Sequence, residues 1–131
     1  MTEVELRKVA IVDDDVAVRD SLRFLLEVLG YSVETFASAA EFLTATIANL
    51  ACLILDNHMP EMSGLELVER LRAGGNGLPI LLVTGSSSPA IVSRAAELGV
   101  SKVLDKPPGE GDLLDFIATT HWADNGTPCG V

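Results

Sequence analysis

Apolar residues along the chain occur in two alternating patterns, short runs and stripes with helical spacing. Three runs are continuously apolar and begin at Val9, Leu50 and Ile80. Two others, 31–36 and 100–104, contain interleaved polar residues. Continuous apolar runs are typical of strands buried on both faces, whereas interleaved runs are typical of strands at a sheet edge. The pattern therefore predicts three central strands and two edge strands.

Helical stripes separate these runs. The first has i, i+4, i+7 and i+11 spacing and is followed by Gly30, as at many helix C-termini. Capping boxes at Ser38 and Ser63, each with Glu three residues later, indicate the starts of the next two helices. Ser88 followed by Pro89 indicates the start of a fourth, with Gly99 past its end. The apolar residues assigned to the first three helices are Val18, Leu22, Leu25, Leu29, Phe42, Leu43, Ile47, Leu67, Val68 and Leu71.

With a last helix over about 112–121, five strands alternate with five helices. This alternation predicts an α/β, doubly wound (βα)5 flavodoxin-like fold, in which a five-stranded parallel sheet has helices on both faces. Strand order 2-1-3-4-5 places the two interleaved runs at the edges. We expect one domain over residues 1–121 and a loose C-terminal tail over 122–131, with no output domain.

Composition narrows the class of protein. The 131 residues include 9 basic and 19 acidic side chains, a net charge of −10. Direct binding to nucleic acid or to an anionic membrane is not expected, because both rely on clustered Lys and Arg. The apolar runs are too short to span a bilayer, and the N-terminus has no apolar segment typical of a signal peptide. Two cysteines form no disulfide framework, so we expect a buried Cys52, a free Cys129 and a cytoplasmic protein.

Reactive side chains follow the predicted strands. Asp13 and Asp14 come after the first strand, Asp56 after the third, Thr84 ends the fourth, and Lys106 follows the fifth. Ligands of such sheets bind beyond the carboxyl ends of the strands, near the switch in strand order. Three carboxylates there should repel one another, raise each other's pKa values and favour Mg²⁺, with Mn²⁺ or a similar hard cation as a substitute. Carboxylate, metal, ammonium and hydroxyl together suit phosphoryl transfer.

Four motifs carry a resemblance to a known family. They are the segment Val12–Asp15, the block LDNHMPEMSG at 55–64, ILLVTG at 80–85, and the pair Lys106-Pro107. In this order they resemble the receiver (phospho-acceptor) domain of bacterial two-component response regulators, over roughly residues 8 to 120. No single motif is specific, but the combination is.

The resemblance implies a role for each matching position. Asp56 would accept a phosphoryl group from the histidine of a sensor kinase or phosphotransfer protein. The protein would then be a signalling switch that acts on a downstream protein target, not a turnover enzyme, and it could form a homodimer through the face from Pro89 to His121. Asp14, Asp56 and the main-chain carbonyl of His58 would bind Mg²⁺ directly, and Asp13 would bind it through water. The hydroxyl of Thr84 would move toward the phosphoryl group, and the ammonium of Lys106 would pair with it. The resemblance also implies a cis peptide bond between Lys106 and Pro107.

Two positions depart from the family pattern. Val103 stands where receivers usually carry Tyr or Phe, and Pro108 stands where Phe usually follows the Lys-Pro pair. A β-branched side chain does not swing between buried and exposed poses as an aromatic ring does. The site chemistry should survive, while the signal from Thr84 to the surface should differ from the family norm.

Other interpretations start from the same residues. Asp15 is best read as a helix N-cap or first-turn residue. A haloacid-dehalogenase-type phosphatase would use Asp13 as nucleophile and Asp15 as general acid, with Thr84 and Lys106 assisting and Mg²⁺ held by Asp112 or Asp115. Ala17 does not fit that motif, and the block around Asp56 would be unexplained. A degenerate receiver that acts only as a binding module is a third reading, against which the complete acid set argues.

Overall fold

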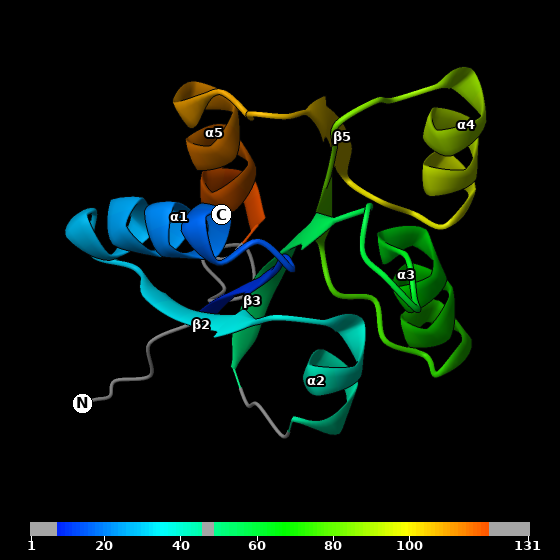
Figure 1. Cartoon of the computed structure of the whole chain (residues 1–131), viewed down its shortest axis with the longest axis horizontal. Helices are drawn as coiled ribbons and strands as arrows, with labels where there is room; N and C mark the ends of the chain where they lie inside the picture. Colours follow the sequence, from blue (N-terminus) through cyan, green and yellow to red (C-terminus); the bar gives the residue numbers. More distant parts are fainter. Residues whose placement is uncertain (1–7, 46–48, 121–131) are drawn as a thin grey trace.

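One parallel five-stranded sheet with helices on both faces forms the molecule (Figure 1). The computed structural model describes residues 8–45 and 49–120. Within them the strand order is β2-β1-β3-β4-β5, so the predicted fold class and order are confirmed. The elements in chain order are β1 (Lys8–Val12), α1 (Val16–Val28), β2 (Ser32–Phe36), α2 (Ala39–Thr44), β3 (Leu50–Asp56), α3 (Gly64–Ala73), β4 (Ile80–Thr84), α4 (Pro89–Glu97), β5 (Lys102–Asp105) and α5 (Glu110–Thr120).

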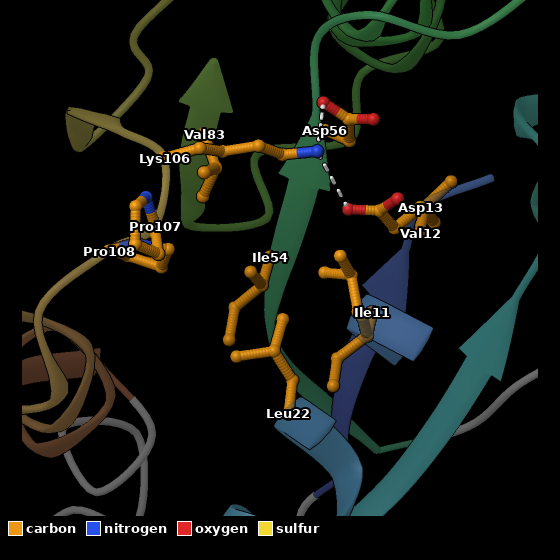
Figure 2. Close-up of a pocket in the computed structure, with 11 residues that line it drawn as sticks. Ile11, Val12, Asp13, Leu22, Ile54, Asp56, Val83, Lys106, Pro107 and Pro108 are labelled. Carbon is orange, nitrogen blue, oxygen red and sulfur yellow. Dashed lines mark ion pairs between the residues drawn. The ribbon is translucent and has the colours of Figure 1, made fainter. Parts of the chain in front are cut away.

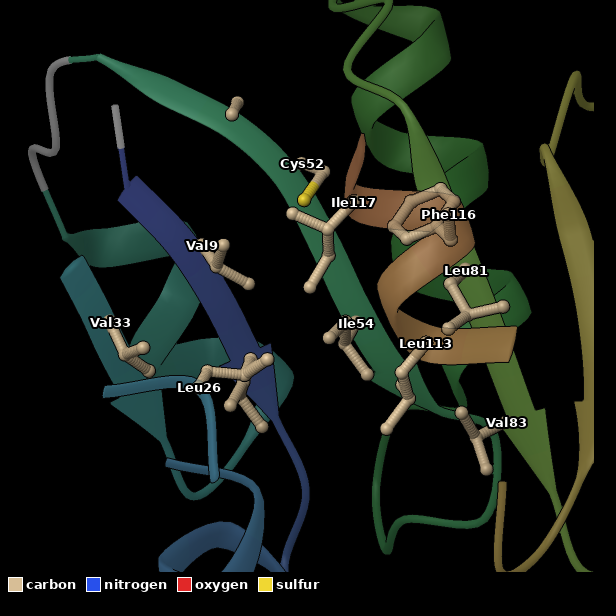
Figure 3. Close-up of a cluster of buried hydrophobic side chains, with 12 residues drawn as sticks. Val9, Leu26, Val33, Cys52, Ile54, Leu81, Val83, Leu113, Phe116 and Ile117 are labelled. Carbon is tan, nitrogen blue, oxygen red and sulfur yellow. The ribbon is translucent and has the colours of Figure 1, made fainter. Parts of the chain in front are cut away.

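Two apolar clusters fix the sheet between its helices. One joins the sheet to α1 and α5 through Leu26, Phe116 and Ile117 (Figure 3). The other joins the opposite face to α2, α3 and α4. Alternate residues of a central strand divide between the clusters, as Val9 and Ala10 of β1 do, because successive strand side chains point to opposite faces. This explains why the central strands are continuously apolar.

The buried stripe of α1 differs from the prediction at its end. Val18, Leu22 and Leu25 are half-buried, but Leu29 is 48% exposed and the fully buried residue is Leu26. Leu29 is the C-cap, one residue past the last helical residue of α1. The helix and its N-cap agree with the prediction, but the last member of the predicted stripe, Leu29, does not share its buried face.

Both edge strands begin later than their apolar runs. Gly30 and Gly99 have φ of +98° and +74°, and the next residues, Tyr31 and Val100, donate their N–H groups back to Leu26 and Ala95 at 3.0 and 2.9 Å. These are Schellman motifs, in which an apolar residue just past the helix packs against its last turn. Tyr31 and Val100 therefore close the preceding helices, and assigning them to strands was wrong.

The other ends of the helices and strands differ less from the prediction. Helix α5 begins at Glu110, two residues before its predicted start. Ser63 and Glu66 form the full capping box of α3, whereas at α2 the Glu41 carboxylate accepts from the N–H of Ala37 at 2.9 Å. The residues Ile47, His121, Trp122 and Cys129 lie outside the described part of the chain, as does the tail 122–131. Cys52 is buried, as predicted. In the described segments, no helix has both the length and the apolar character needed to span a membrane.

Candidate functional site

Three carboxylates meet at the carboxyl ends of β1 and β3. These neighbouring strands bring Asp13 and Asp14 beside Asp56, with one oxygen from each within 4.8 Å of the others. Asp13 and Asp56 are only 3% and 2% exposed, while Asp14 is exposed. Sequence reasoning predicted this meeting from strand order, and the geometry agrees.

The ammonium of Lys106 lies between two of these acids (Figure 2). Its Nζ is 3.3 Å from Asp13 Oδ2 and 3.2 Å from Asp56 Oδ1. The main chain aligns this lysine, because its N–H donates to the carbonyl of Thr84 at 2.9 Å. The peptide bond between Lys106 and Pro107 is cis, the isomer expected from the resemblance. A cation from beyond β5 thus neutralises part of the acidic cluster.

Burial raises the pKa of Asp56 above its ordinary value, and the negative charge of Asp13 adds to this rise. A hydrogen bond from the N–H of His58 to Oδ1, at 3.1 Å, and the charge of Lys106 act in the opposite direction. The predicted repulsion among the acids is therefore present at Asp56, but it is a smaller cause than desolvation.

Burial alone would lower the pKa of Lys106. The charges of Asp13 and Asp56, together with the hydrogen bonds to them, outweigh burial and hold this pKa above its ordinary value. Lys106 is therefore a cation throughout the physiological pH range.

Local backbone contacts hold the acidic loop after β1. Asp13 Oδ1 accepts from the N–H of Asp15 at 2.9 Å, and Asp15 caps α1 by accepting from Ala17 and Val18, as predicted. Arg19, one turn into α1, donates to the carbonyl of Asp13 at 2.8 Å. Sequence reasoning missed Arg19, because a basic residue in a first turn opposes the helix dipole and suggested no role.

The loop after β3 is closed by its own polar groups. Asn57 is buried, and its side-chain oxygen accepts from the N–H of Leu65 at the start of α3, at 3.0 Å. Gly64 packs against this loop so closely that a Cβ there would lie 2.7 Å from the carbonyl oxygen of Asp56. The glycine of the 55–64 block thus permits the close approach that fixes the direction of Asp56.

Thr84 is fully buried at the end of β4, and its hydroxyl contacts the ring of His58. The distance from Oγ1 to Nε2 is 2.9 Å, and the N–H of Ser86 also donates to Oγ1 at 3.2 Å. Sequence reasoning gave His58 a role through its carbonyl only. No spacing rule indicated that its ring would reach across to β4.

The donor set fits a hard divalent cation. The side-chain hydrogen bond and ion pair of Asp56 with described residues both use Oδ1, so the buried Oδ2 accepts no hydrogen bond from them. The exposed carboxylate of Asp14 is likewise without a partner in residues 8–45 and 49–120. Two free carboxylate oxygens beside a third acid match the all-oxygen ligands that Mg²⁺ takes, with water completing its shell.

An apolar cavity of about 250 Å³ lies directly beneath the charged groups (Figure 2). Val18 and Leu22 of α1 form one wall, and Pro107 and Pro108 form another. Val103, the other unusual position, is half-buried against the cluster shared with α3 and α4. Pro108 therefore lines the cavity beside the site, whereas Val103 pairs with Leu82 of β4.

The rival phosphatase residues lie elsewhere. Asp112 and Asp115 belong to α5, and neither is in the acidic cluster found among the described residues. Asp15 is occupied as the N-cap of α1. The haloacid-dehalogenase reading is wrong, because the acids that meet are those of the receiver pattern.

Comparison with known proteins gives the same class. A family model described as the response regulator receiver domain matches residues 9–118. The transcriptional regulatory protein FixJ of Azorhizobium caulinodans is 41% identical over 110 residues, which cover 83% of this chain and 52% of FixJ. The response regulator protein TmoT of Ectopseudomonas mendocina is 40% identical, over 83% of this chain and 50% of TmoT. The chain thus spans about half the length of these curated relatives.

Solved structures agree. The response regulator StyR superposes with a TM-score of 0.84 at 39% identity, over 92% of this chain and 62% of StyR. A CheY-like receiver domain protein from Methanospirillum hungatei JF-1 gives 0.80 at 33% identity, over 88% of this chain and 93% of its own.

The sheet and its acidic strand ends define a signalling module of the two-component type. The chain belongs to the response regulator receiver domain family.

Proposed function

We propose that this receiver domain is a phosphorylation-controlled switch in which Asp56 accepts the phosphoryl group. The observation that carries the proposal is the free Oδ2 of Asp56, a buried carboxylate oxygen beside Asp14 and Lys106 with no hydrogen bond from the described residues. That free oxygen can bind the metal, so that the second carboxylate oxygen of Asp56 attacks phosphorus with positive charge beside it.

In the proposed transfer, an oxygen of Asp56 forms a bond to phosphorus while the phosphorus–nitrogen bond of a phosphohistidine breaks. The released imidazole keeps the electron pair of that bond and takes a proton. Lys106 pairs with a phosphoryl oxygen, and the hydroxyl of Thr84 donates to another. Asp14, Asp56 and the main-chain carbonyl of His58 would hold Mg²⁺, with Asp13 acting through water, and the bound ion would supply positive charge to the phosphoryl oxygens.

The proposed partners are a sensor histidine kinase or phosphotransfer protein in the cytoplasm and a downstream protein target. The net charge of −10 disfavours direct contact of this domain with nucleic acid. Output would pass through the face formed by α4, β5 and α5, either to a target or to a second copy of the chain. With Val103 in place of an aromatic ring, this output would depend on movement of the backbone near Thr84. The domain would act by changing affinity, not by turnover.

The proposal is tested by treating the chain with acetyl phosphate and Mg²⁺ and mapping the phosphorylated residue by mass spectrometry after borohydride reduction. We expect label at Asp56 and none in Asp56→Asn or in the presence of EDTA. Asp15→Asn is a matched control, because it removes a neighbouring carboxylate while an amide can still cap α1.

Three results would contradict parts of the proposal. Label on Asp13 would exclude Asp56 as the acceptor. Transfer that persists in EDTA would exclude the metal assignment. Absence of label in the wild type, combined with unchanged partner binding by Asp56→Asn, would favour a receiver that acts only as a binding module.

A further inference from the structure

His58 joins the ends of two neighbouring strands through two different groups. Its main-chain N–H donates to Oδ1 of Asp56 at 3.1 Å, and its ring Nε2 lies 2.9 Å from Oγ1 of Thr84. Any residue except proline could make the first contact at position 58, but the second needs a side chain with a polar atom at the reach of Nε2. His58 is exposed, whereas Thr84 is fully buried. The ring therefore reaches the hydroxyl from the solvent side.

The hydrogen-bonding capacity of Thr84 fixes the direction of this contact. A hydroxyl has one proton to donate and two lone pairs that accept. The N–H of Ser86 uses one lone pair. Suppose that Nε2 also donated to Oγ1. The buried hydroxyl proton would then have no acceptor among residues 8–45 and 49–120, because Nε2 is the one possible acceptor that contacts Oγ1 within these residues. Such an unmet donor is costly. This count of donors and acceptors favours a ring that accepts at Nε2 and carries its own proton on Nδ1.

The same proton is the one that a phosphoryl group on Asp56 would need. Under the proposed function, on which this inference rests, Thr84 donates to a phosphoryl oxygen. It has only one proton, so it cannot serve both acceptors fully. We propose that the His58 ring holds the Thr84 hydroxyl in the unphosphorylated form and competes with the phosphoryl group for it. His58 is thus a positioning residue that acts through Thr84 and weakens the phosphoryl-bound state.

The competition predicts that a substitution of His58, beside the proposed phospho-acceptor, raises the affinity for a phosphoryl mimic instead of lowering it. Affinity for beryllofluoride, a stable mimic of the phosphoryl group, is measured by calorimetry with excess Mg²⁺ at one fixed pH. His58→Leu should bind it about three- to tenfold more tightly than the wild type, the factor that corresponds to one ordinary hydrogen bond. His58→Gln keeps a polar atom at similar reach and should stay within about twofold of the wild type.

Two further measurements separate this role from a structural one. In a Thr84→Val background there is no hydroxyl to release, so His58→Leu should leave beryllofluoride affinity unchanged. In the wild type, ¹⁵N NMR of the imidazole should show the proton on Nδ1 before beryllofluoride is added and loss of the Thr84 contact afterwards. The His58→Gln spectrum assigns the signal, since the chain has two histidines.

Weaker or equal binding by His58→Leu would overturn the inference, as would an equal gain in the Thr84→Val background. A wild type that fails to bind beryllofluoride, as Asp56→Asn must fail, would overturn the proposed function and this inference together. A wild type that binds it normally while His58→Leu shows no gain would overturn the inference alone.

Discussion

At the scale of single residues, the site is a compromise between burial and charge. Asp56 must be buried to meet Lys106 and the strand ends, yet burial raises its pKa and makes its ionised form costly. The N–H of His58 and the ammonium of Lys106 offset only part of this cost. The carboxylate of Asp56 is therefore held in a state that a divalent cation would relieve.

This cost predicts how stability depends on pH without metal. Because the pKa of Asp56 in the fold lies above the ordinary 3.8, the folded chain holds more protons than the unfolded chain between these two values. Stability from this group is therefore lost as the pH rises through that window and stays low above it. The neutral side chain of Asp56→Asn avoids the loss, so the variant should gain stability over the wild type across the window.

The measurement is urea unfolding in EDTA at several pH values between 4 and 7.5. Asp15→Asn, which removes an exposed carboxylate at a helix cap, serves as the control and should show no comparable gain. A stability difference between Asp56→Asn and the wild type that does not change with pH would contradict the role given to burial.

At the scale of elements, the loop between β3 and α3 is built around one close contact. A Cβ on Gly64 would lie 2.7 Å from the carbonyl oxygen of Asp56, 2.9 Å from Cα of Asn57 and 3.0 Å from a methyl of Leu82. Two of these neighbours are backbone atoms of Asp56, the proposed phospho-acceptor, and of the residue after it. The helix therefore cannot accept a side chain here without moving the loop.

Gly64→Ala should accordingly destabilise the protein by about 1–3 kcal/mol, the usual cost of overpacking. It should also slow labelling of Asp56 by acetyl phosphate more than the stability loss explains. Gly111→Ala is the control: it lies in α5 with nothing within 4 Å of its Cβ and should be neutral or slightly stabilising. Chemical denaturation and the rate of labelling measure the two effects, and wild-type values for Gly64→Ala in both would contradict the contact.

The helices and strands could be predicted because a continuously apolar run indicates a strand that is buried on both faces of the sheet. That signal placed β1, β3 and β4 at the centre and so brought Asp13 and Asp56 together. It failed at Tyr31 and Val100, because an apolar residue that closes a helix looks the same in sequence as the first residue of a strand. It also could not predict the contact between His58 and Thr84, which depends on a side chain crossing between strands, or the reach of Arg19 to a carbonyl.

At the scale of the whole molecule, part of the excess of acidic side chains is concentrated at one place in the fold. Three of the 19 acidic residues, Asp13, Asp14 and Asp56, lie in one cluster with a single lysine. Two of the three are buried in a fold whose strands β1 and β3 run through both apolar clusters. Repulsion at the cluster therefore acts on the centre of the sheet, and a cation bound there should stabilise the entire fold.

Magnesium should consequently raise the melting temperature. A ligand that binds only the folded state adds about 1.4 kcal/mol at tenfold excess over its dissociation constant. For a domain of this size that is a rise of about 3–6 °C. Asp14→Asn and Asp56→Asn each remove one of the oxygens proposed as direct ligands, so both should lose most of the rise. Asp15→Asn changes the net charge equally and should keep it. Differential scanning calorimetry with MgCl₂ and with NaCl of equal ionic strength separates binding from screening, and an equal rise in both salts would contradict a metal site at these strand ends.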